Sequence, residues 1–203
     1  RDLLWHNPMM APRAAPHGAN FDDWWSGGWD EIFPSGDRGT LYGELLPSMG
    51  ELWCVPWTAE ASSDGDTASI TATGFGTIAA ARLERRLSLR GNEPILHAHY
   101  RIDNLDVRPL PFTWGVHPAF AVTPFHRIDH PGREMLVGVS SDSSMGVAGH
   151  RYRWPELPDP SQPAGGRDMR RVRPREESVF GGHWAMDLPE GWLALTDTST
   201  GRG

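Results

Sequence analysis

The stretch FTWGVHPAFAVTPF, residues Phe112–Phe125, decides the fold class that we expect for this chain. Residues that favour strands precede His117, and because proline has no N–H to donate to a sheet, Pro118 marks a strand end or an edge. Alternation along a strand places Gly115 and His117 on one face, and the missing side chain of Gly115 leaves space beside the imidazole. We therefore predict that His117 can transfer protons near neutral pH. A histidine satisfied inside a polar crevice is the alternative.

Strand patterns recur along much of the chain, and we find no convincing helical period. We expect strands at residues 69–73, 78–89, 95–104, 137–147, 178–188 and 192–196, with a strand, a turn and another strand over 41–57. We expect loops at 60–66 and at 154–175, which are polar or rich in proline and glycine. The sequence therefore predicts an all-β protein. It is expected to form one domain over residues 1–203, since β-sandwiches often reach ~200–250 residues as single units.

The ends of the chain suggest that it is part of a longer protein. It starts without methionine, and it stops after residues 198–202, a turn that we expect to return into another strand. We therefore expect the fold to be incomplete at both ends.

Composition excludes several classes of function. The formal net charge of −7 argues against nucleic acid or an anionic membrane as a partner. Cys54 is the single cysteine, so an internal disulfide is impossible and a reducing, cytoplasmic location is expected. No apolar stretch is long enough to span a bilayer. All nineteen basic residues are arginine, which excludes a Schiff-base lysine and a lysine-anchored pyridoxal cofactor.

Tryptophan is abundant, with ten residues in 203, and three of them lie in the segment FDDWWSGGWDEIFP, residues Phe21–Pro34. Flat aromatic faces beside carboxylates are a common way to hold sugar rings. We therefore expect a binding loop on a rigid scaffold, in which Trp29, Asp30 and Glu31 contact the ligand and the two carboxylates accept hydrogen bonds from sugar hydroxyls. The alternative is an aromatic plug beneath a loop.

Several pieces of the chain, taken in order, resemble the aldose 1-epimerase (galactose mutarotase-like) family. They are GGWDEIFP at Gly27–Pro34, GELW at Gly50–Trp53, Asn104, PFTWGVHPAF at Pro111–Phe120 and LTDTSTGR at Leu195–Arg202. The resemblance implies a large antiparallel β-sandwich with a sugar-binding groove on one concave face. It also implies interconversion of the α and β anomers of an aldose without a metal or an organic cofactor.

The reaction requires one acid and one base near C1 and O5 of the sugar, and each is typically worth ~10²–10⁴ in rate. In the family a histidine of the HP motif is the acid, which His117 matches, and a glutamate late in the chain is the base, for which we find no equivalent. Met49, which we expect to contact the substrate, stands where the family usually has a histidine, and a thioether has no proton to give. The resemblance implies an isomerase that acts on a small-molecule sugar. A non-catalytic carbohydrate-binding protein of the same fold is the alternative, which Met49 favours.

Three further residues are candidates for the same groove. Glu51 follows the Met49–Gly50 pair, and His183 and Asp187 lie in a later strand segment. A different reading starts from His97 and His99, which share one strand face as in some metal-dependent β-sandwich enzymes. No glutamate stands at the required spacing, so we favour solvent-facing histidines and expect no metal site. The oligomeric state and the identity of the sugar are left open.

Overall fold

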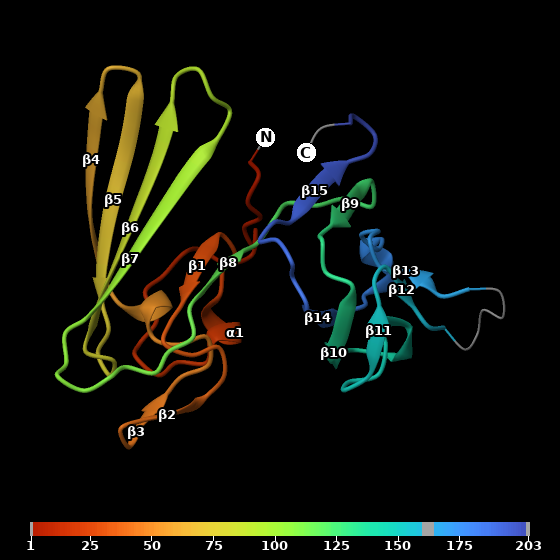
Figure 1. The fold of residues 1–203 in the computed structure, drawn as a ribbon, viewed down its shortest axis with the longest axis horizontal. Helices are drawn as coiled ribbons and strands as arrows, with labels where there is room; N and C mark the ends of the chain where they lie inside the picture. The colour runs from red at the N-terminus through yellow and green to blue at the C-terminus, as the bar shows by residue number, and fades with distance from the viewer. Residues whose placement is uncertain (1, 160–164, 202–203) are drawn as a thin grey trace. The chain divides into compact units, whose positions relative to one another are not determined.

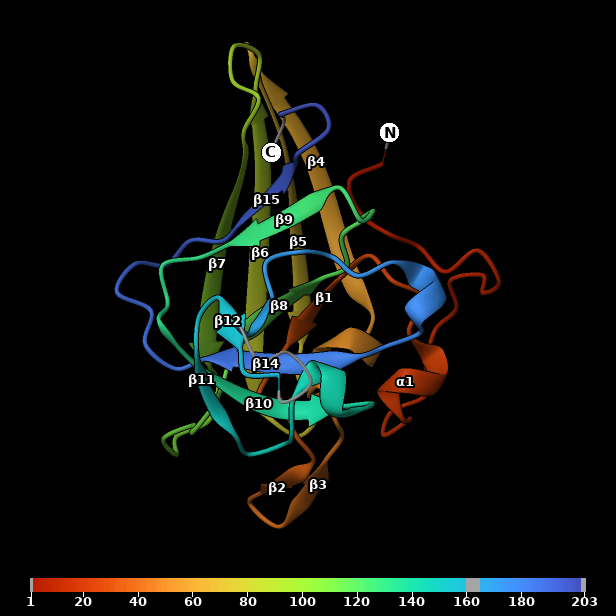
Figure 2. The ribbon, with the colours of Figure 1, turned by 90° about the vertical axis from the view of Figure 1, so that its right-hand side faces the viewer.

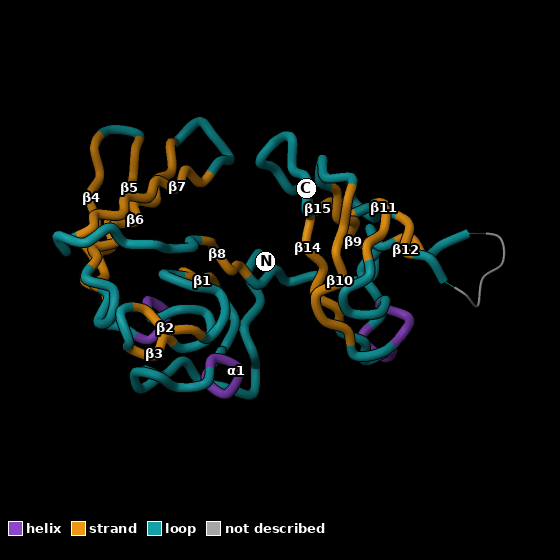
Figure 3. The backbone as a smooth tube through the Cα atoms, turned by 60° about the horizontal axis from the view of Figure 1, so that its bottom comes forward, coloured by secondary structure: helices purple, strands orange, loops and turns teal. Residues whose placement is uncertain are grey.

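The computed structural model describes residues 2–159 and 165–201, and strands and loops dominate it (Figure 3). The all-β class expected from the sequence is confirmed. The chain divides into two compact units, Arg1–Ala121 and Val122–Gly203, and the single domain expected over residues 1–203 stays a prediction. In the described part, no helix has both the length and the apolar character needed to cross a membrane.

The first unit consists of one helical turn, a short 3₁₀ turn and eight strands. Its elements are α1 (Phe21–Trp24), β1 (Trp29–Ile32), β2 (Gly39–Leu41), β3 (Glu44–Leu46), η1 (Leu52–Cys54), β4 (Trp57–Asp64), β5 (Thr67–Phe75), β6 (Ala81–Arg90), β7 (Leu96–Asn104) and β8 (Gly115–Pro118). Strands β4 to β7 form an antiparallel sheet in sequence order, which extends well beyond α1, β1 and β8 (Figure 1). Strands β2 and β3 form a hairpin, and β1 pairs with β8.

The two faces of the four-stranded sheet differ sharply in polarity. Directly paired residues share a face, so the register places Gly74, Leu83 and Ile102 on one face of the sheet. The other residues of this face are mainly apolar, and Arg85 is an exception among them. The end of this apolar face that carries Ala81 and Leu83 covers the core of the unit. The buried members of that core are Phe33, Leu41, Leu46, Leu52, Ala79, Ala81 and Leu83. The opposite face carries charged and hydroxyl side chains, as the alternation in residues 95–104 predicts.

Three segments of the first unit differ from the expectation. Residues 41–57, expected as a strand, a turn and another strand, contain β3 and then the 3₁₀ turn η1 where the second strand was expected. Residues 60–66, expected as a polar loop, belong mostly to β4, because Trp57, Ala59 and Ala61 alternate onto the apolar face and each residue of the strand pairs with β5. The tryptophan-rich segment, expected as a loop throughout, contains α1 and β1. Pairing with β8 supplies the backbone partners that local sequence does not reveal.

In residues 122–159 and 165–201, the second unit forms seven short strands and two 3₁₀ turns. They are β9 (His126–Asp129), β10 (Glu134–Ser140), η2 (Ser143–Met145), β11 (Arg151–Arg153), β12 (Glu156–Leu157), β13 (Arg167–Asp168), η3 (Arg175–Glu177), β14 (Gly181–Ala185) and β15 (Ala194–Asp197). Five of these strands form one sheet in the order β14, β10, β11, β12, β13, in which β10 lies beside β14 (Figure 2). Strand β9 pairs with β15 in a separate sheet. A small core forms under this sheet, and its buried residues are Met135, Val137, Tyr152 and Leu157.

The expected strands of the second unit are confirmed at β14 and β15, whereas the expected strand 137–147 ends at Ser140 and is followed by η2. The segment 154–175, expected as a loop, contributes the two-residue strands β12 and β13. Residues 160–164 of that segment, and Arg202 of the expected turn, lie outside the described residues.

Candidate functional site

Strands β1 and β8 form an antiparallel ribbon that holds Asp30 directly opposite His117. The chain enters β1 through Gly27, which has φ +85°, and a Cβ at this position would collide with the carbonyl oxygen of Trp5. Only glycine combines this backbone conformation with such a close approach. Directly opposed residues have Cβ atoms ~4.5–5.5 Å apart on the same face. The register therefore brings the Asp30 carboxyl group and the His117 imidazole close together.

The imidazole of His117 is partly buried between aromatic rings. Its ring centroid lies 5.6 Å from that of Phe21 and 5.3 Å from that of Trp25. Its Nδ1 atom is buried and has no hydrogen-bond partner among residues 2–159 and 165–201. A Cβ at Gly115 would meet none of the described atoms within 4 Å, so the face that Gly115 shares with His117 is open, as the sequence predicts. The open space lies at Gly115, two residues before the histidine, while the imidazole itself is held between Phe21 and Trp25.

The carboxyl group of Asp30 is oriented by one defined contact. The Trp25 indole Nε1 donates a hydrogen bond of 2.9 Å to Asp30 Oδ2. Burial raises the pKa of Asp30, while the Trp25 hydrogen bond and the charges of His117 and Arg85 act in the opposite direction. The carboxyl group, with its raised pKa, and the neighbouring imidazole are two titratable groups, and each can act as a proton donor or as a proton acceptor.

A cavity of about 230 Å³ adjoins Asp30, and His117 is not among the residues that line it. Its walls include Phe21, Trp24, Trp25, Trp53 and Asp30. Sites for drug-sized ligands typically measure ~300–1,000 Å³, so this cavity suits a smaller molecule. A flat aromatic lining with one carboxyl group is suited to a polar ring that stacks on the tryptophans and donates hydrogen bonds to Asp30.

Strand alternation separates the three candidates of the tryptophan-rich segment. Asp30 shares its face with His117, whereas Trp29 and Glu31 point to the other face of β1. Glu31 is only 3% exposed, and its Oε1 accepts hydrogen bonds from Arg85 Nη1 at 2.8 Å and from the Tyr100 hydroxyl at 3.1 Å. Burial raises the pKa of Glu31, and burial together with the Glu31 charge raises the pKa of Tyr100 to about 12.

The expectation that Glu51 faces a sugar groove does not fit its surroundings. Its side chain is fully buried, with both oxygens occupied by backbone donors. Oε2 accepts from the N–H groups of Thr77 and Ile78, and Oε1 accepts from that of Ala79, each at 2.8 Å. Glu51 therefore anchors the connection between β5 and β6. Met49, just before it, has φ +65° and donates its backbone N–H to the carbonyl oxygen of Gly36.

The two remaining candidates belong to the second unit, where both have local structural contacts. His183 Nδ1 lies 3.1 Å from the Tyr152 hydroxyl, and burial lowers the pKa of His183. Asp187 is exposed, and its Oδ1 accepts the backbone N–H groups of Arg133 and Glu134 at 2.9 and 2.7 Å. These two bonds lower the pKa of Asp187. Within their unit, His183 lies on β14 beside Tyr152, and Asp187 caps the start of β10.

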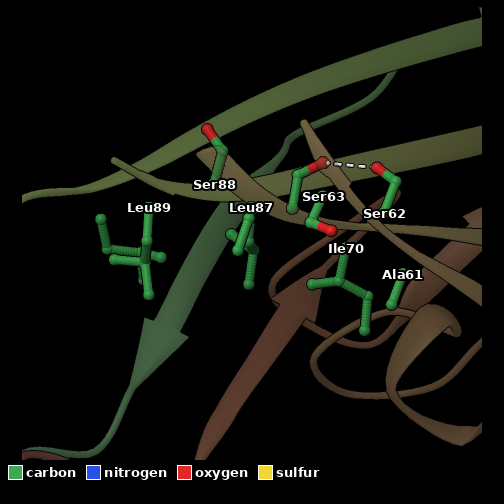
Figure 4. A pocket seen from close by; sticks show the side chains of 10 residues that line it. Ala61, Ser62, Ser63, Ile70, Leu87, Ser88 and Leu89 are labelled. Carbon is green, nitrogen blue, oxygen red and sulfur yellow. Dashed lines mark hydrogen bonds between the residues drawn. The ribbon is translucent and has the colours of Figure 1, made fainter. Parts of the chain in front are cut away.

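A larger hollow of about 490 Å³ lies on the apolar face of the four-stranded sheet (Figure 4). Its lining consists of leucine, isoleucine, alanine and serine side chains and carries no titratable group. Ile70, Leu89 and Leu96 are 42%, 51% and 47% exposed there. The hollow therefore offers apolar contact and hydroxyl groups but no acid or base.

His97 and His99 do not gather metal ligands around them. His97 Nε2 lies 2.8 Å from Glu93 Oε2, and His99 is exposed on the polar face of the sheet. Within residues 2–159 and 165–201, we find no group of three histidine, cysteine or acidic side chains with the geometry to hold a metal ion.

We found no significant similarity to a family model, to a curated protein or to a solved structure.

Sequence reasoning missed the residues that shape the site around the candidates. Trp25 and Phe21 contact His117, and Trp53 lines the cavity, but only the segments that contain them had been singled out. Arg85, which binds Glu31, lies 54 positions along the chain in β6. A single arginine on an otherwise apolar strand face was the only available signal for it.

Proposed function

We propose that this chain is an aldose 1-epimerase-like isomerase that interconverts the anomers of a small sugar. The carrying observation is the direct pairing of His117 with Asp30, which also lines a cavity with aromatic walls. The resemblance of the HPAF and GGWDEIFP segments to that family supports the same reaction. We also propose that the two units are part of a galactose mutarotase-like β-sandwich, for which the antiparallel sheets are a necessary feature.

The proposed mechanism divides proton transfer between the two paired groups. Opening the hemiacetal ring removes the proton from the anomeric hydroxyl and adds a proton to the ring oxygen, and closing on the other face reverses both transfers. O1 and O5 are bonded to the same carbon, so two side chains whose Cβ atoms lie ~4.5–5.5 Å apart on facing strands can reach both. His117 donates the proton to O5, and Asp30 accepts the anomeric proton. Asp30 takes the role of base, for which the sequence alone offered no residue.

Polarimetry on freshly dissolved α-glucose and α-galactose tests the proposal. The wild type should accelerate mutarotation, and His117→Ala and Asp30→Asn should each reduce the catalysed rate ~10²–10⁴-fold. His99→Ala is the matched control, since His99 lies exposed on the polar face of the sheet and should retain the wild-type rate. Unchanged rates in both site variants would refute the assignment of the pair.

The alternative function is carbohydrate binding without catalysis. Met49 favours it, because a thioether replaces a histidine that could take part in proton transfer. In that case calorimetric titration should detect sugar binding that His117→Ala weakens, while polarimetry detects no acceleration by the wild type. The two functions therefore give opposite polarimetric results for the same protein.

A further inference from the structure

The face of β1 opposite His117 carries a second cluster of polar groups, which the acid–base mechanism does not use. Glu31 is only 3% exposed, and its Oε2 has no hydrogen-bond partner in the described part of the chain. The same holds for the buried Nε of Arg85 and the buried Nε1 of Trp29. Buried polar atoms are nearly always paired, so three unpaired atoms in adjoining side chains indicate a missing partner.

These side chains are neighbours in the fold. Trp29 and Glu31 are two residues apart on one face of β1, and Arg85 Nη1 lies 2.8 Å from Glu31 Oε1. The Tyr100 hydroxyl holds the same carboxyl oxygen from β7. The carboxylate therefore has one oxygen fixed by two donors and the other oxygen unused.

The unpaired atoms have a specific chemical complement. Trp29 and Arg85 each offer one N–H donor, and Glu31 offers one acceptor. A single hydroxyl group has two lone pairs to accept and one proton to donate, which matches this set. A carbonyl or an ether oxygen cannot donate to Glu31, and an ammonium group cannot accept from the two N–H groups.

Aromatic rings flank the cluster, as in sites that bind the apolar faces of sugar rings. The guanidinium of Arg85 lies 5.8 Å from the ring of Trp57, and the rings of Tyr100 and Trp114 are 4.8 Å apart. The hollow in Figure 4 lies on the same sheet face and includes Leu87, two residues after Arg85. Arg85 and Tyr100 of the cluster therefore share one sheet face with the hollow.

We propose that Trp29, Glu31 and Arg85 form a hydroxyl-binding site that takes a hydroxyl group of a sugar or polyol. The site is separate from the Asp30–His117 pair, because it lies on the other face of β1. It is independent of anomer interconversion and holds whether or not the chain is an isomerase. An ordered water offers the same hydroxyl chemistry, so the experiment separates these two sources.

The test follows the Trp29 indole N–H in ¹H–¹⁵N spectra, assigned by its disappearance in Trp29→Phe. The probes are methyl α-D-glucopyranoside and methyl α-D-galactopyranoside, which cannot mutarotate. We expect saturable movement of the Trp29 resonance with at least one of them. Glu31→Gln should weaken that binding roughly tenfold to hundredfold, the value of a hydrogen bond to a charged group. Arg85→Gln is a second variant should Glu31→Gln fail to fold.

Two controls make the outcomes decisive. Glu44→Gln, on the exposed β3, should leave the affinity unchanged. Asp30→Asn should reduce the catalysed mutarotation rate ~10²–10⁴-fold if the proposed function is right, yet leave the Trp29 response intact, so the two proposals can fail separately. A Trp29 resonance that neither probe moves would overturn the inference. So would an unchanged affinity in Glu31→Gln and Arg85→Gln, or a bound water at Trp29 that saturating glycoside does not displace.

Discussion

Replacing Glu51 with glutamine tests how the turn before η1 is joined to the rest of the first unit. The carboxylate accepts three backbone N–H groups from residues 77–79, and its own backbone N–H donates to the carbonyl oxygen of Phe33 at 2.8 Å. Glu51 thus connects the end of β1, the η1 turn and the β5–β6 connection. Glu51→Gln preserves the shape of the side chain but gives it only one acceptor oxygen.

The cost follows from the contacts that remain. In the best orientation the amide oxygen still faces Thr77 and Ile78, and each bond falls from ~1.5–3 kcal/mol for a charged acceptor to ~0.5–1.5 kcal/mol for a neutral one. These two changes cost about 2–3 kcal/mol. The N–H of Ala79 then faces an NH₂ group and stays unpaired, which costs ~1–3 kcal/mol. Together Glu51→Gln should destabilise the unit by about 3–6 kcal/mol, a large part of the ~5–15 kcal/mol typical of a folded protein.

Urea denaturation at pH 7, followed by tryptophan fluorescence, measures this difference. The midpoint should fall while the slope m stays constant, since the folded surface is unchanged. Glu44→Gln, which neutralises an exposed glutamate on β3, should alter the free energy of unfolding by no more than ~0.5 kcal/mol. If Glu51→Gln were as stable as this control, the carboxylate would not be holding the β5–β6 connection and the reasoning would be refuted.

Three further predictions concern a glycine and two titratable groups. Gly50→Ala should destabilise by about 2–5 kcal/mol in the same urea assay, because Gly50 has φ +72° and a Cβ there would collide with backbone, whereas Gly36→Ala meets open space and should cost far less. Burial lowers the pKa of His183 below 6.5, so the unfolded chain takes up the proton first. Thermal stability should fall as the pH drops below 6.5, and His183→Gln should reduce that fall; an equal fall in the variant would contradict the assignment. Burial raises the pKa of Asp30 above 3.8, so the acidic limb of the mutarotation rate should lie above that pH. Trp25→Phe removes a hydrogen bond that lowers this pKa and should move the limb higher; a shift to lower pH would count against Asp30 as the base.

Much of the fold follows from local pattern. Alternation over residues 95–104 predicted β7 with Tyr100 and Ile102 toward the core, and the strand before Pro118 was predicted at β8. The same reasoning failed at β4, where serine, glutamate and aspartate suggested a loop. Such residues are tolerated because β4 is an edge strand with one solvated face, and local composition does not reveal which neighbour supplies its hydrogen bonds.

The site was predicted in part. The open space beside His117 follows from Gly115, but the facing residue depends on the register of β1 against β8, which is a long-range property. The same register separates Asp30 from Glu31, although the two are adjacent in sequence. Glu51 looked like a ligand-binding carboxylate, because the backbone donors that occupy it come from more than twenty residues away.

By itself the sequence determined the all-β class, the exposed and core faces of β7, and the presence of a histidine at a strand end before a proline. These depend on contacts between residues close in the chain, where alternation and the missing N–H of proline act directly. Only the tertiary structure decided which carboxylates face the histidine, a salt-bridged arginine or backbone amides. The reason is physical: aspartate and glutamate look the same in the sequence whatever their role. Their chemistry is set by the charges and hydrogen-bond donors that distant strands bring within a few ångströms.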